Sequence, residues 1–201
     1  MRKLNNLFLT ICLIFNLFSC VNRNCNILKL SDSDKEWFKP YESKNSNFVF
    51  ASNKSNIDTL ELDSKLTFDL TPCNKFELGE YQFERGIVRL KSKNFKAQPS
   101  YCHNIDLLLK RKKDESIITF DIFNLSETYK FIDLKNIKID TLSVDSLNLI
   151  YVALHFEAEK NIKKGCPKSD LQLKSFRWSK SEGLVSFEFE DGEEFILIDK
   201  F

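Results

Sequence analysis

The chain has 201 residues, of which 42% are hydrophobic and 29% charged, a composition that fits about one globular domain and excludes wholesale disorder. Its formal net charge is +1, and it has neither the basic field that attracts nucleic acid nor a long acidic block. Phe occurs 19 times while Gly occurs only 5 times, which favours strands around a ring-rich core, although an AT-rich genome would also raise the Phe content.

The N-terminus has the pattern of an export signal. Arg2 and Lys3 precede an apolar run over 7–18, which is shorter than the ~20 residues of a membrane-spanning helix and has the length of a signal-peptide core. The run ends in a motif that resembles a lipobox, in which a small residue precedes a cysteine that is lipidated: Leu17, Phe18, Ser19 and Cys20. The resemblance implies cleavage after residue 19, fatty acyl chains such as palmitate on Cys20, and a lasting membrane anchor.

The residues after Cys20 predict the membrane in which the lipoprotein is finally located. No Asp follows the cysteine directly and no acidic cluster lies within the next few residues, 21–24. By resemblance to known sorting signals, this argues against retention in the inner membrane and against display on the cell surface. We therefore expect a lipoprotein of the cell outer membrane that faces the periplasm. Residues 1–19 would form the signal peptide, 20–30 a lipidated tether with a first strand, and 31–201 a β-rich globular domain.

The remaining cysteines predict disulfides, because an exported domain folds in an oxidising compartment. Four are left once the leader and the lipidated residue are set aside: Cys25, Cys73, Cys102 and Cys166. Four cysteines permit three pairings, and the sequence leaves the choice open. The turn-like surroundings of Cys73 and Cys102 favour that pair, which would leave Cys25 with Cys166. No Cys-x-x-Cys spacing occurs and only 2 His are present, so the sequence predicts no metal site.

A short helical turn is expected next. Ser33 and Glu36 have the spacing of a capping box, and Pro40 is expected to end the turn. Trp37, Phe38 and Tyr41 would then fix the turn onto a β core.

Alternation of apolar and polar residues dominates from Phe48 onward and predicts strands. It recurs over 48–50, 59–63, 65–70, 79–84, 118–122 and 185–190. The basic run 110–113, followed by Asp114 and Glu115, indicates a solvated hairpin loop. Asp191-Gly192 between two alternating runs predicts a hairpin with a type I′ turn.

The segment 147–158 is apolar on both sides, which predicts a central strand covered on both faces. His155 within it is expected to be a satisfied core or edge residue rather than a ligand. No helical pattern is long enough for a parallel crossover. The predicted fold is therefore mainly β, a single antiparallel sandwich or partly open barrel with one or two short helical turns.

Both ends of the chain resemble small uncharacterised lipoproteins of Bacteroidota. At the C-terminal end, the resemblance rests on aromatic-Ser-Lys in 176–180, Gly-Leu-Val at 183–185 and a last apolar strand over 195–197. At the start it rests on Glu-Trp-Phe-x-Pro-Tyr over 36–41, where Lys39 interrupts the usual run. This resemblance implies the compartment and the fold, and it brings no activity with it.

The sequence gives no catalytic motif: GxSxG, Walker A, GxGxxG and HExxH are all missing. We therefore expect no enzyme and no cofactor. The leading interpretation is a membrane-anchored envelope lipoprotein that acts as a non-catalytic binding or interaction module. Its partners would be membrane lipid, through acylated Cys20, and an envelope protein or apolar ligand. Two alternatives stay open: a carrier of an apolar ligand in a β cavity, and a hydrolase of envelope material.

Overall fold

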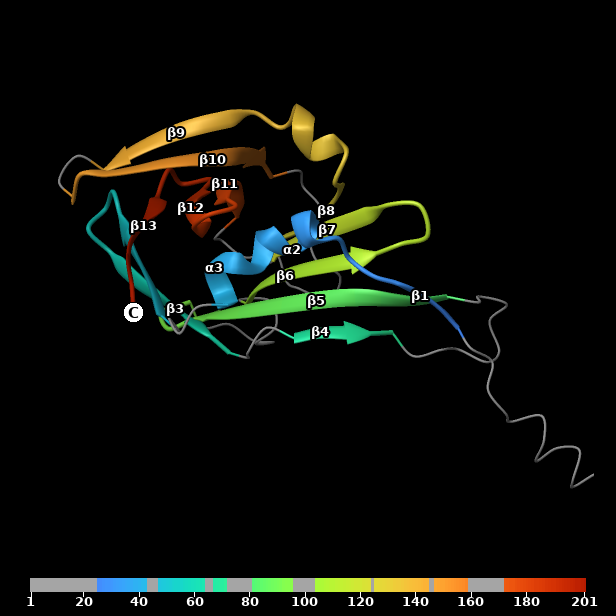
Figure 1. Ribbon diagram of the computed structural model, residues 1–201. Coiled ribbons are helices and arrows are strands. Elements are labelled where there is room, and N and C mark those ends of the chain that lie inside the picture. Colours follow the sequence, from blue (N-terminus) through green and yellow to red (C-terminus); the bar gives the residue numbers. More distant parts are fainter. Residues whose placement is uncertain are drawn as a thin grey trace, which may run out of the picture.

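The computed structural model describes residues 25–42, 47–63, 67–71, 81–95, 104–123, 125–144, 147–158 and 172–201. These residues form one curled sheet in the order β8-β7-β6-β5-β3-β2-β13-β12-β11-β10-β9, with β1 and β4 also paired to β5 (Figure 1). The predicted mainly β fold is confirmed, and the sheet takes the form of a curled half-barrel. No helix in the described part is both long enough and apolar enough to cross a membrane.

In chain order, the first seven strands are β1 (Asn26–Leu28), β2 (Asn47–Ser52), β3 (Ile57–Leu62), β4 (Thr67–Leu70), β5 (Tyr81–Ser92), β6 (Asn104–Arg111) and β7 (Ser116–Ile122). They are followed in the chain by β8 (Leu125–Lys130), β9 (Ile139–Val144), β10 (Leu149–Glu157), β11 (Leu173–Ser179), β12 (Gly183–Phe189) and β13 (Glu194–Lys200). Neighbours pair antiparallel except β1, which runs parallel to β5 and so departs from the predicted pattern. The predicted solvated loop joins β6 to β7, where the Lys112 N–H donates to the Glu115 carbonyl.

Aromatic rings fill the concave side of the sheet. The Phe120 ring lies 5.0 Å from the rings of both Phe156 and Trp178, and Phe156 stacks on Phe176 at 4.7 Å. A second group of rings packs further along the sheet: Phe95, Phe123, Phe187, Phe189 and Phe195. The high Phe content therefore supplies the core, as the alternation predicts.

A helical segment lies between the two arms of the curled sheet (Figure 1). It consists of α2 (Asp32–Lys35), η1 (Glu36–Phe38) and α3 (Lys39–Glu42), and a further short turn, η3 (Asp133–Asn136), follows β8. The predicted anchors are confirmed, since Trp37, Phe38 and Tyr41 are all buried. Burial of three large aromatic side chains stabilises this segment by several kcal/mol, at roughly 1.5–3 kcal/mol each.

Two details of the predicted helix are wrong. The cap is Ser31, whose hydroxyl accepts from the Asp34 N–H while the Asp34 carboxylate accepts from the Ser31 N–H, so the capping box begins two residues before Ser33. Pro40 does not end the helix, because it occupies the first turn of α3, where a missing N–H costs no helical hydrogen bond.

The helical segment is also fastened to the sheet by buried polar contacts. The Glu84 carboxylate on β5 accepts from the Leu30 backbone N–H at 2.8 Å and from Lys35 Nζ at 2.9 Å. The Ser116 hydroxyl on β7 donates to the Asp34 carboxylate at 2.8 Å. These contacts fix the segment in position.

The hairpin predicted at Asp191-Gly192 is confirmed, because β12 and β13 pair antiparallel around it. The type I′ turn is wrong. That turn needs positive φ at both central residues, whereas Gly192 has φ +78° and Asp191 is not among the residues with positive φ. The loop between the two strands has four residues, 190–193, and within it the Gly192 N–H donates to the Phe189 carbonyl at 3.0 Å.

The predicted strand over 147–158 is confirmed as β10, but its predicted burial on both faces is wrong. Tyr151 and Ala153 are buried, whereas Ile150 and Val152 are exposed. The reason is the register: β11 pairs with β10 only over residues 154–157, so the first half of β10 extends beyond its inner neighbour. The strand that is covered on both faces is β12, where even Ser186 is fully buried.

Candidate functional site

Exposed β-branched side chains gather on one face of β9 and β10. Ile150, Val152 and Ile139 are 71%, 62% and 66% exposed. Ile150 and Val152 alternate with buried residues along β10, and Ile139 pairs directly with Leu154, so all four side chains share one face. Neighbouring exposed apolar side chains on one face of two adjacent strands mark a candidate binding surface.

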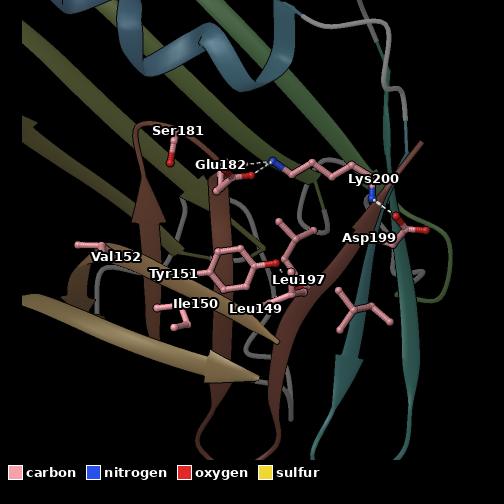
Figure 2. A pocket seen from close by; sticks show the side chains of 10 residues that line it. Leu149, Ile150, Tyr151, Val152, Ser181, Glu182, Leu197, Asp199 and Lys200 are labelled. Carbon is pink, nitrogen blue, oxygen red and sulfur yellow. Dashed lines mark hydrogen bonds and ion pairs between the residues drawn. The ribbon is translucent and has the colours of Figure 1, made fainter. Parts of the chain in front are cut away.

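The stripe borders two adjoining hollows that share Val152 and Ser181. We call them together the β10 groove. The first hollow has a volume of about 490 Å³ and lies between β10 and the last residues of β13, as Figure 2 shows. The second has a volume of about 320 Å³ and lies between β9, β10 and the end of β11. Both volumes fall in the range of ligand pockets in proteins.

The first hollow is held in shape by polar contacts across its floor. The Tyr151 hydroxyl donates to the Leu197 carbonyl at 2.8 Å, which joins β10 to β13 (Figure 2). Burial, together with the nearby Glu182 carboxylate, raises the pKa of Tyr151. Lys200 Nζ donates to the Glu182 carboxylate at 2.7 Å, so these two charges are paired.

The second hollow combines apolar walls with a basic rim. Its lining includes Ile139, Val152 and Leu154 together with Trp37 and Trp178. Lys180 stands at the rim, with Nζ 5.6 Å from the Trp37 ring centroid. The Glu36 carboxylate lies 3.8 Å from Lys180 Nζ and 3.5 Å from Lys39 Nζ, so two cations share one anion.

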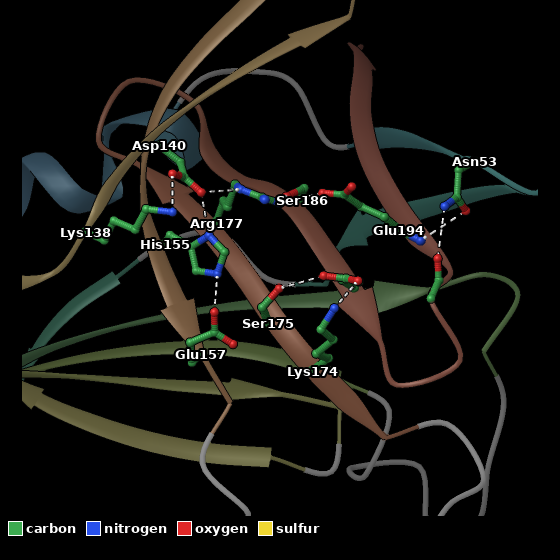
Figure 3. Close-up of polar contacts among 12 residues, drawn as sticks. Asn53, Lys138, Asp140, His155, Glu157, Lys174, Ser175, Arg177, Ser186 and Glu194 are labelled. Atoms are coloured by element: carbon green, nitrogen blue, oxygen red, sulfur yellow. Dashed lines mark hydrogen bonds and ion pairs between the residues drawn. The ribbon is translucent and has the colours of Figure 1, made fainter.

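The opposite face of the same strands carries a chain of charged side chains (Figure 3). Asp140 lies 3.0 Å from Lys138, 2.6 Å from His155 and 3.4 Å from Arg177. Lys138 and then His155 hold the pKa of Asp140 well below its usual range. Arg177 continues the chain to Glu194 and Ser186.

This charged chain has the chemistry of a structural network. His155 lies between Asp140 and Glu157, at 2.6 Å and 3.0 Å, so the prediction of a satisfied histidine is confirmed. In the described part of the chain, no three His, Cys, Asp or Glu side chains are grouped so that they could hold a metal ion. The charged side chains therefore link neighbouring strands from β9 to β13. The β10 groove is the stronger candidate for a binding site.

Most of the site residues predicted from the sequence lie outside the described residues. These are Leu17, Phe18, Ser19 and Cys20 of the lipobox, and Cys73, Cys102 and Cys166. Cys25, at the start of the described chain, is disulfide-bonded, and its partner lies outside the described residues. The anchor and both disulfide pairings thus stay predictions.

Sequence reasoning missed the β10 groove. The sequence did contain a signal, because both odd- and even-numbered residues over 149–154 are apolar. That pattern is typical of a strand buried on both faces, but also of a strand that leaves one apolar face open to a ligand. No family model, curated protein or solved structure matches this chain.

Proposed function

We propose that this protein is a cell-envelope lipoprotein anchored through acylated Cys20, and that its β domain is a non-catalytic binding module. The observation that carries the proposal is the β10 groove, where Ile150 and Val152 are exposed beside two hollows. Leaving large aliphatic side chains in water costs roughly 1.5–3 kcal/mol each relative to burial. A partner that covers them would recover this free energy.

The position of the groove relative to the predicted anchor supports the same role. Figure 1 shows β1 at one end of the domain and the start of β10 at the other. Only five residues, 21–25, lie between Cys20 and Asn26, the first residue of β1. Such a tether reaches roughly 20 Å when fully extended, so an anchored domain would present the groove away from its own membrane.

The packing of the described interior bears on the alternatives. Phe120, Phe156 and Phe176 are fully buried and in mutual ring contact, so these rings occupy the concave side of the sheet. A ligand carried by this protein would therefore lie in the open β10 groove. A hydrolase of envelope material would need converging catalytic groups, whereas the Glu182 carboxylate in the groove is paired with Lys200.

The anchor is tested by labelling growing cells with radioactive palmitate. The native chain should incorporate label and lose its leader, whereas Cys20→Ala should remain uncleaved and unlabelled. Equal palmitate incorporation by both chains would contradict the anchor.

The binding surface is tested by placing the photoreactive residue benzoylphenylalanine at position 152 in the cell. The matched control is position 57, where Ile57 on β3 is 57% exposed and does not line the groove. The proposal predicts a discrete covalent adduct from position 152 and none from position 57. The same products from both positions would contradict a binding role for the groove.

A further inference from the structure

We propose that the β10 groove binds a free long-chain carboxylate, with its acyl chain along Ile150 and Val152 and its carboxylate at the Lys180 rim. This inference rests on the proposed function and names the ligand of the same site. The two hollows share Val152 and Ser181, so together they form one elongated surface: the second hollow is mainly apolar, and the first combines the apolar side chains of β10 with polar groups at its β13 end. A single unbranched chain has that shape.

The charges of the two ends set the direction of the ligand. At the β11 end, Lys180 and Lys39 share the single carboxylate of Glu36, which leaves an excess of positive charge. At the β13 end, Lys200 is already paired with Glu182, and the Asp199 carboxylate adds negative charge to the lining. A carboxylate is therefore favoured at Lys180 and disfavoured at Lys200.

Two buried hydrogen-bond donors lie beside the Lys180 end of the groove. Trp37 and Trp178 both line this hollow and are 2% and 1% exposed, and neither indole N–H has an acceptor within the described part of the chain. An indole N–H only donates, and a buried donor without a partner costs roughly 1–3 kcal/mol.

The position of the groove in the domain argues against a bilayer surface as the occupant. A bilayer would need the groove to face the anchored membrane, whereas the start of β10, which lines the groove, lies at the end of the domain opposite β1 (Figure 1). The ligand is therefore a free carboxylate amphiphile rather than a headgroup of the anchoring membrane.

The two tryptophans make a direct test, because they are the only 2 in the chain and both line the groove. The anchored protein, reconstituted in phosphatidylcholine nanodiscs, is titrated with dibromostearate, whose bromines quench nearby indole fluorescence, and with unbrominated stearate as the control. Saturable quenching is expected from the native chain. Val152→Glu should weaken it about tenfold or more, because a charge then enters the apolar groove. Ile57→Glu should leave it unchanged.

Two further variants keep the test decisive. Ile150→Glu, at the most exposed position of the stripe, replaces Val152→Glu if the latter lowers the melting temperature. Lys180→Gln should weaken binding of the carboxylate about two- to fivefold and leave binding of its methyl ester unchanged. Quenching that is unsaturable and equal in every variant would overturn the proposal. An absence of quenching, together with a protein adduct at position 152 in the cell, would contradict the carboxylate as the ligand. It would still support the proposed function as a binding module.

Discussion

The hydroxyl of Tyr41 accepts a hydrogen bond from the backbone N–H of Leu184 at 3.0 Å, which joins α3 to the start of β12. Gly183, the residue before, has φ +79°, and a Cβ placed there would meet the Tyr41 hydroxyl and lie 2.6 Å from its Cζ. Glycine at this position allows both the left-handed backbone and the close approach of the buried ring.

Gly183→Ala should therefore lower the free energy of unfolding by about 2–4 kcal/mol, measured by urea denaturation, since backbone strain and overpacking act together. Gly192→Ala is the matched control, because Gly192 has φ +78° and open space around it. It should cost only about 1 kcal/mol. Equal losses in the two variants would show that the Tyr41 contact contributes nothing.

Asp58 should titrate above its usual range. Burial raises the pKa of its carboxyl, and the Ser92 hydroxyl, donating at 2.7 Å, offsets only part of that shift. A carboxyl whose pKa is higher in the folded state destabilises the fold above that pKa and ceases to do so once protonated. The native chain should thus gain stability relative to Asp58→Asn as the pH falls from 7 toward 4. A carbon-detected NMR titration midpoint for Asp58 below 3.8 would contradict this expectation.

Asp140 should behave in the opposite way. Its pKa is lowered by Lys138 and His155, so its contribution to stability is present above the pKa of the unfolded chain and is lost as the pH falls toward its folded pKa. Thermal unfolding should show Asp140→Asn less stable than the native chain at pH 7, with the two melting temperatures converging below about pH 4. A gap in melting temperature that stays constant down to pH 2 would assign the effect to something other than this charge.

The sequence predicts the strands well, because alternation over segments such as 118–122 directly reflects a sheet with one buried face. The predictions fail where side-chain exposure or a helix cap depends on how distant segments pair and pack. The exposure of Val152 depends on where β11 ends, and the cap at Ser31 depends on which hydroxyl reaches Asp34. Neither quantity is encoded in local periodicity. The groove at β10 was missed for the same reason, since it forms only where β9, β11 and β13 meet.

Phe120 should be the most costly ring to remove. Its ring contacts those of Trp37, Tyr129, Phe156, Phe176 and Trp178. Phe120→Ala should therefore lower the free energy of unfolding by about 3–5 kcal/mol, measured by urea denaturation. Phe201→Ala is the control, because that ring is exposed, and it should change stability by less than about 0.5 kcal/mol.

The most direct test of an anchored binding module combines its two parts in one measurement. Benzoylphenylalanine at position 152 is irradiated in cells that make either the native chain or the Cys20→Ala variant. We expect a strong adduct from the native chain and none from the unlipidated precursor, because binding then requires that the domain be anchored at its membrane. Equal adduct yields from the two chains would contradict it.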